Sequence, residues 1–170
     1  MNDGASGGFA IRDAAENDLP QILAIHNHHI ATSFAIWRNE RETLADRAAW
    51  LHDRRNGGYP VIVAAEGDEI LGYGSFGSFR TGAGYNRTVE NSIYVRDDRQ
   101  RRGVARALMA DLIGIAQSQG RHVMVAGIGL PNDASVALHA SLGFVECGVI
   151  REIGWKFDQW LDLKMMQKML

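Results

Sequence analysis

Residues 95–105 read VRDDRQRRGVA, and the fold is decided around this stretch. Residues 89–95 alternate in polarity and predict a strand, whereas residues 104–115 carry apolar side chains at helical spacing and predict a long helix that closes at Gly120. A basic turn between a strand and a helix can bind an anion. The first N–H groups of a helix lack partners, and Gly103 lets the backbone approach a ligand closely.

Two phosphate-binding motifs are missing from this turn, which limits the ligands that it could bind. It has neither the lysine-serine end of a P-loop nor the glycine spacing of a dinucleotide fingerprint, which disfavours ATP and NAD. A pyrophosphate of another carrier fits the pattern. A second interpretation stays open, in which the arginines form a solvated basic face and Gly103 only begins a helix.

Outward from this turn, the pattern predicts one mixed α/β sheet. We expect residues 1–8 to form a flexible tail and residues 9–170 a single domain. Expected strands span residues 9–13, 61–66, 70–76, 89–95, 122–128, 145–150 and 160–167, with a Gly67-Asp68 hairpin turn. Expected helices run from Asp18 to about Ile30, over 43–56, over 104–120, and from Pro131-Asn132-Asp133 to Leu142-Gly143.

Composition excludes several classes of partner. The net charge of −2 over 170 residues gives no global positive field, so we expect no nucleic acid and no membrane as partner. No apolar run is long enough to span a bilayer and no signal peptide is visible, so we expect a cytoplasmic protein. Cys147 is the only cysteine, which excludes an internal disulfide, and we expect it to pack within a strand.

The chain resembles the GNAT superfamily of acetyl-CoA-dependent N-acetyltransferases. The pattern Gln100-x-x-Gly103-x-Ala105 resembles the pyrophosphate loop of that family, and Asn132, Ser135, His139 and Leu142-Gly143-Phe144 match its later segment. Residues 88–95, 125–128, 131–139, 154–157 and 160–162 are similar to the phosphinothricin and methionine sulfoximine branch. The resemblance implies a GNAT-like fold, with a central, twisted, mostly antiparallel sheet flanked by helices. It also implies acetyl-CoA as co-substrate, a small amino-acid-like acceptor amine, and direct transfer in a ternary complex.

The resemblance also implies which residues bind the co-substrate. These are Ile93, Tyr94, Val95, Gln100, Arg101, Arg102, Gly103, Val104, Ala105, Arg106, Asn132 and Ser135. Asn132 could instead be only a helix cap. A backbone N–H near Tyr94 or Val95 is the expected donor to the acetyl oxygen.

Two residues are expected to carry the acid–base chemistry. Glu90 shares one face of its strand with Ser92 and Tyr94, and there it could take the proton of an ammonium directly or through water. His139 could protonate the departing thiolate, or it could bind CoA or substrate. From the residues alone both could be ordinary structural side chains, and the resemblance favours the functional role. No visible feature activates Cys147, which disfavours a ping-pong route.

Cationic and aromatic residues are expected to line the acceptor site. Arg80 and Lys156 are the candidates for binding an anionic group, with Phe34, Trp37 and Tyr85 as walls. Residues 26–29 read HNHH, but no further ligands accompany them, so we expect no metal. The aromatic segment 155–160 resembles a dimer-interface segment of the branch, and we expect a homodimer.

Two other functions stay open at this point. The chain could be a non-catalytic sensor of acetyl-CoA that works through a protein partner. It could also be an acetyltransferase that acts on a protein N-terminus or a polyamine.

Overall fold

The computed structural model describes residues 8–170, which form one seven-stranded sheet in the order β1-β2-β3-β4-β5-β7-β6. The strands are β1 (Ala10–Asp13), β2 (Val61–Glu66), β3 (Glu69–Ser78), β4 (Thr88–Val95), β5 (Val123–Gly129), β6 (Val145–Lys156) and β7 (Gln159–Met169). Every neighbouring pair is antiparallel except β4 with β5. The expected mixed, mostly antiparallel sheet is therefore confirmed. The prediction of a tail over residues 1–8 lies, apart from Gly8, outside the described residues.

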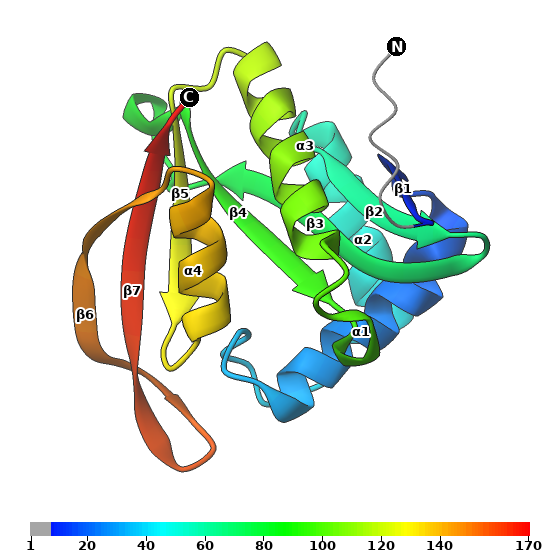
Figure 1. The fold of residues 1–170 in the computed structure, drawn as a ribbon, viewed down its shortest axis with the longest axis horizontal. Coiled ribbons are helices and arrows are strands. Elements are labelled where there is room, and N and C mark those ends of the chain that lie inside the picture. The colour runs from blue at the N-terminus through cyan, green and yellow to red at the C-terminus, as the bar shows by residue number, and fades with distance from the viewer. Residues whose placement is uncertain (1–7) are drawn as a thin grey trace.

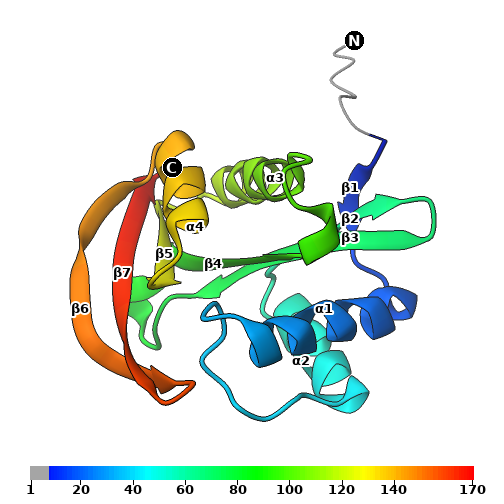
Figure 2. The ribbon, with the colours of Figure 1, turned by 60° about the horizontal axis from the view of Figure 1, so that its bottom comes forward.

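Helices cover both faces of the sheet (Figures 1 and 2). On one face lie α1 (Leu19–Thr32) and α2 (Leu44–Asn56), and on the other lie α3 (Val104–Ser118) and α4 (Asp133–Ser141). The side chains of α3 pack with β2–β5 and β7 in the larger core, and those of α1 and α2 pack with β2 and β3 in a smaller one. Short 3-10 turns span Glu16–Asp18, Ala83–Tyr85 and Asp97–Arg99. No helix of the described residues is long and apolar enough to cross a bilayer.

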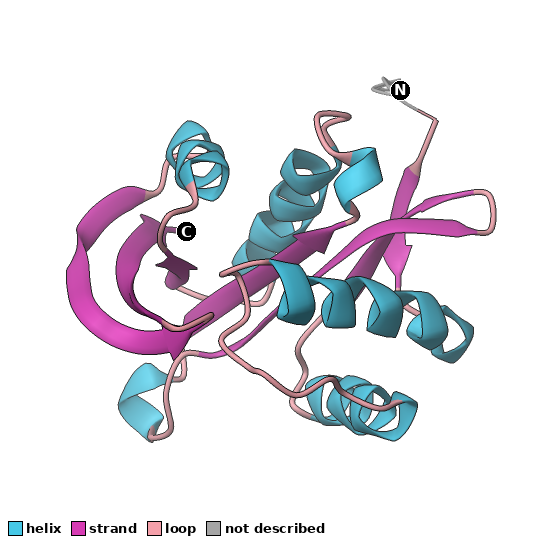
Figure 3. Ribbon diagram, turned by 90° about the horizontal axis from the view of Figure 1, so that it is seen from below, coloured by secondary structure: helices cyan, strands magenta, loops and turns pink. Residues whose placement is uncertain are grey.

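Several element boundaries differ from the prediction. α1 begins after Asp18 as expected but runs to Thr32, and the Asp18 side chain does not cap it, because its carboxylate accepts from the Ala15 N–H at 2.7 Å and pairs with Arg12 at 2.7 Å. β6 runs to Lys156 through an irregular stretch, where Glu152 has φ 52° and its N–H donates to Asp162 Oδ1 at 2.8 Å. Figure 3 shows β6 and β7 curving away from the other strands.

The prediction for Cys147 was wrong. Its side chain is exposed on β6, at the edge of the sheet, rather than packed in the core. The run from Phe144 to Cys147 reads as strand but gives no sign of which strand faces solvent.

Candidate active site

A cleft opens where β4 and β5 separate. The two strands pair only from Thr88–Val123 to Glu90–Val125, although β4 continues to Val95 and β5 to Gly129. Successive N–H groups of a strand point to opposite edges. The Arg96 N–H donates to Leu71 O on the β3 side at 2.9 Å, so the N–H of Val95 points to the open edge and that of Tyr94 points to β3. Of the two donors expected from the sequence, Val95 is therefore the one on the cleft.

A cavity of about 540 Å³ occupies this cleft. Residues from both diverging strands, the β4–α3 turn and α4 line it. The co-substrate residues expected from the sequence that line it are Ile93, Tyr94, Val95, Gln100, Arg101, Gly103, Val104, Ala105, Arg106, Asn132 and Ser135. His139 also lines it, together with unpredicted residues that include Ala35, Asn91, Gly127 and Gly129. The structure thus brings together segments that lie far apart in the chain.

The β4–α3 turn presents unpaired backbone donors to this cavity. Arg101 has φ 61°, and Gly103 has φ 81°, a conformation that favours glycine. The earliest helical bond runs from the Ala107 N–H to Gly103 O at 3.0 Å, so the N–H groups of residues 104–106 have no acceptor within the helix. Together with the positive end of the helix dipole they form an anion site.

The arginines of this region have different roles. Arg102 pairs with Glu66 at 2.6 Å and does not line the cavity, so it holds the turn to the β2–β3 hairpin. Arg106 donates to Ser141 Oγ of α4 at 2.8 Å. Arg101 is exposed and lines the cavity, and none of residues 8–170 forms an ion pair with it. The expectation that Arg102 binds the co-substrate directly is therefore not supported by its position.

Glu90 lies at the last paired position of β4, where the cleft begins. Its strand faces alternate as predicted, since Ile93 and Val95 pack in the α3 core whereas Tyr94 contacts His26 and His29 of α1. A Cβ atom added to Gly127 would lie 3.0 Å from Glu90 Oε1. Glu90 itself does not line the cavity, but Gly127, which its carboxylate adjoins, does. Burial raises the pKa of Glu90, an effect that the charges of Arg80 and Arg54 oppose.

His139 is buried on α4 and bridges to β4. Its Nδ1 lies 2.8 Å from Ser135 O, and its Nε2 lies 3.2 Å from Asn91 Oδ1. The amide of Asn91 is oriented because Nδ2 donates to Val125 O at 3.0 Å. Burial lowers the pKa of His139, which favours the neutral ring. Asn91 was not identified as a site residue from the sequence. Its position, a polar residue on the apolar face of a strand, was the signal that could have indicated it.

Asn132 caps α4 and also lines the cavity. Its Oδ1 accepts from the Ser135 N–H at 3.1 Å, as the alternative reading from the sequence proposed. The cap fixes the start of the helix that carries His139.

The residues expected to bind the acceptor lie on the α1 and α2 face of the sheet or on loops beside it. Trp37 donates from Nε1 to Phe34 O at 2.9 Å and lies against Gly129 and Gly154, whose missing side chains leave room for its ring. Arg80 is exposed in the β3–β4 loop, stacked on Phe79, and close enough to affect the pKa of Glu90. Tyr85 is exposed in the same loop and packs edge-on against Phe79.

Lys156 is not available to bind an anionic substrate. It is 1% exposed, and its Nζ donates to Ser33 O at 2.7 Å and to Ile36 O at 2.6 Å. The side chain therefore clamps the α1–α2 loop, residues 33–43, to the β6–β7 hairpin. Burial lowers its pKa. The other end of this loop is held by Asn27, which exchanges two hydrogen bonds with the backbone of Glu42.

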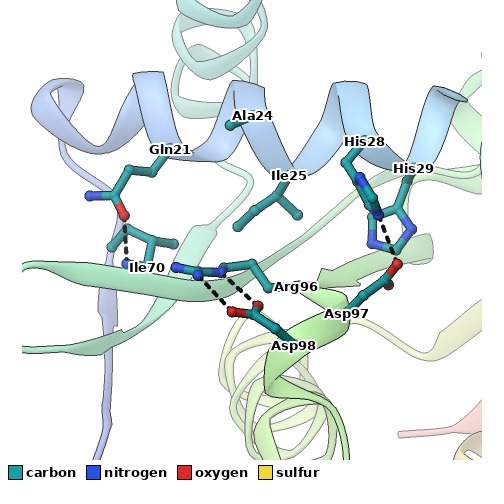
Figure 4. Close-up of a pocket in the computed structure, with 9 residues that line it drawn as sticks. All are labelled: Gln21, Ala24, Ile25, His28, His29, Ile70, Arg96, Asp97 and Asp98. Carbon is teal, nitrogen blue, oxygen red and sulfur yellow. Dashed lines mark hydrogen bonds and ion pairs between the residues drawn. The ribbon is translucent and has the colours of Figure 1, made fainter. Parts of the chain in front are cut away.

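The histidines of α1 are bound to protein groups. His26 Nδ1 lies 2.6 Å from Tyr73 Oη, and burial lowers the pKa of His26 to about 4. His29 Nε2 lies 2.9 Å from Val95 O. His28 lines a second cavity, of about 380 Å³, between α1 and the β4–α3 turn, where it pairs with Asp97 at 2.7 Å (Figure 4). The polar side chains drawn there bond to one another or to backbone, so this region ties α1 to the turn.

The fold, the anion-binding turn and the cleft define an acetyltransferase, and the chain belongs to the GNAT family. The model of the acetyltransferase (GNAT) family matches residues 22–144. The chain is 46% identical to an L-methionine sulfoximine/L-methionine sulfone acetyltransferase of Pseudomonas aeruginosa, with 93% of this chain and 92% of the relative covered.

Solved structures with acetyl-CoA show the same fold. A Salmonella typhimurium acetyltransferase with acetyl-CoA is 42% identical, with a TM-score of 0.93 over 96% of this chain and 94% of that one. A Sinorhizobium meliloti phosphinothricin acetyltransferase in complex with acetyl-CoA is 32% identical, with a TM-score of 0.93 over 96% and 89%.

Proposed function

We propose that the protein transfers the acetyl group of acetyl-CoA to the α-amine of a small amino acid of the methionine sulfone, methionine sulfoximine or phosphinothricin type. One observation carries the proposal: Gly127 both lines the cleft cavity and adjoins Glu90, so the proposed base lies beside the proposed co-substrate site. The names of the relatives at 46% and 32% identity support the acceptor class.

The pyrophosphate of acetyl-CoA would bind the free N–H groups of residues 104–106, with Arg101 beside them. The thioester would lie along the open edge of β4, where the Val95 N–H can donate to the acetyl oxygen. The cavity of about 540 Å³ and its unpaired backbone donors fit such a ligand.

The reaction needs one base and one proton donor. Glu90 takes a proton from the ammonium, and the amine nitrogen attacks the thioester carbonyl. The C–N bond forms, the C–S bond breaks, and the thiolate leaves. The nitrogen must then lose a second proton, and the departing thiolate can take it up, because a thiol has an ordinary pKa of about 8.5. The neutral ring of His139 can donate a hydrogen bond to the sulfur as it leaves.

A thiol-release assay tests the proposal. Purified protein with acetyl-CoA should release CoA when methionine sulfone, methionine sulfoximine or phosphinothricin is added. Glu90→Gln should lower kcat by about 100-fold or more and leave acetyl-CoA binding near wild type. Background release with all three acceptors would reject the acceptor class, and full turnover by the variant would reject Glu90 as base.

We further propose a homodimer built on the β6–β7 hairpin. The edge strand β6 and the hairpin end expose large apolar side chains, among them Val145 at 60%, Trp155 at 49% and Trp160 at 60%. The rings of Trp155 and Trp160 pack against each other with centroids 5.0 Å apart, and an exposed apolar cluster of this kind is typical of an interface. Light scattering should give twice the mass of the chain, and a monomer at micromolar concentration would contradict it. The cytoplasmic location stays a prediction.

A further inference from the structure

Arg54, in the last turns of α2, extends over the sheet next to Glu90. A Cβ atom on Gly77 of β3 would overlap Nη1 of Arg54 and lie 3.1 Å from its Nη2. The guanidinium therefore rests on the bare backbone of Gly77. Any side chain at position 77 would displace it.

Gly77 stands directly opposite Glu90 in the antiparallel register of β3 and β4. Paired residues of this kind project from the same face, with Cβ atoms about 4.5–5.5 Å apart. Arg54 thus fills the place of the cross-strand neighbour of the catalytic base. Its charge lowers the pKa of Glu90 against the effect of burial.

The guanidinium of Arg54 has no acidic partner. Among residues 8–170 no side chain or backbone oxygen forms a hydrogen bond or an ion pair with it; besides Gly77, it lies near the ring of Tyr59, 6.0 Å from the ring centroid. Nearby arginines differ, since Arg47 pairs with Glu42 at 2.5 Å and Arg55 donates to Ala14 O at 2.7 Å. Arg54 is partly buried, and this burial lowers its pKa. A partly desolvated charge without a partner favours binding of an anion.

We propose that Arg54 binds the α-carboxylate of the acceptor; this rests on the proposed function. An α-amino acid carries its ammonium and its carboxylate on one carbon atom. Glu90 and Arg54 lie side by side on one sheet face, so the carboxylate of Glu90 can face the ammonium while the guanidinium of Arg54 faces the carboxylate. Arg54 thereby replaces Lys156, which is bound to the α1–α2 loop, as the less exposed cation of the proposed site, and Arg80 is the exposed one.

Two acceptors that differ only in the carboxylate test this assignment. kcat/KM is measured with methionine sulfone and with its carboxamide, for wild type, Arg54→Gln, Arg54→Lys and the control Arg41→Gln, which removes an exposed guanidinium from the α1–α2 loop. Arg54→Gln should lose about 10- to 100-fold with the acid and less than about threefold with the amide. Arg54→Lys should fall between, because it keeps the charge and loses the planar fork.

Three other results would contradict either the role of Arg54 or the proposed function. Equal losses with acid and amide, with a shifted acid limb in both pH profiles, would assign Arg54 to tuning Glu90 and overturn the proposal. Equal use of acid and amide by wild type would also overturn it, even if every Arg54 variant failed to fold. No turnover by wild type with either compound or with any other amino acid would instead reject the proposed function, and the inference with it.

Discussion

Gly127→Ala should lower turnover without lowering the stability of the fold. The added methyl group would lie 3.0 Å from Glu90 Oε1, whereas ordinary contacts begin at 3.4 Å, so the carboxylate must move by about 0.4 Å. A misplacement of about 1 Å can cost about 100-fold, so this shift alone accounts for roughly sixfold. The methyl group also takes space beside the carboxylate that the amine needs. We expect kcat to fall by about 10- to 100-fold.

The fold should tolerate this change. Gly127 does not have a positive φ, and its other neighbours, Leu163 and Met165, lie at 3.5 and 3.8 Å from the added atom. Replacing glycine by alanine at such a position stabilises a protein by about 0.4–1 kcal/mol. The Tm should therefore stay level or rise while activity falls.

Steady-state kinetics with methionine sulfone, calorimetric binding of acetyl-CoA and thermal unfolding are the measurements. Acetyl-CoA affinity should change by less than about threefold, because the pyrophosphate turn is untouched. Gly114→Ala on α3 is the matched control, since an added Cβ there meets nothing within 4 Å. Turnover of Gly127→Ala within twofold of wild type would refute the placement of Glu90 at the reacting end of the cleft.

Three further predictions follow from the same geometry. Because burial raises the pKa of Glu90 above 4.5, kcat/KM should fall on acidification with a midpoint above pH 4.5, and Glu90→Gln should lack this limb. Lys156→Met leaves two carbonyls without their donor; we expect about 2 kcal/mol lower stability by denaturant unfolding and a higher KM for the acceptor only, and an unchanged acceptor KM would contradict the clamp. Asn91→Leu removes the acceptor facing His139 Nε2 and should lower kcat about tenfold, with little further loss when His139→Ala is added; additive losses in this double-mutant cycle would contradict their coupling.

The order of elements was predictable because local signals agree with it. The alternation over residues 89–95, the basic turn and the helical spacing after Gly103 each follow from the backbone conformation that the residues favour. The Gly67-Asp68 turn between β2 and β3 is likewise a short-range signal. These signals act within a few residues of chain.

Contacts between distant segments of the chain could not be predicted from the sequence. Lys156 and Arg54 are both cationic side chains beside aromatic residues, yet the fold commits the first to two carbonyls and leaves the second unpaired over Gly77. Which cation is free depends on the α1–α2 loop and on the register of β3 with β4. The residues around Cys147 do not indicate that it lies on an exposed edge strand. Those around Arg102 do not indicate that it pairs with Glu66.

The Lys156 clamp makes a point about how this enzyme could be redesigned. The loop that carries Phe34 and Trp37 is hydrogen-bonded to a hairpin more than a hundred residues downstream. The position of the loop therefore depends on a segment near the other end of the chain. Exchanging that hairpin with one from a relative would reposition the loop that we propose as a wall of the acceptor site, without altering Glu90 or the β4–α3 turn. If this loop contacts the acceptor as proposed, grafting a remote segment would vary the substrate range while Glu90 and His139 stay unchanged.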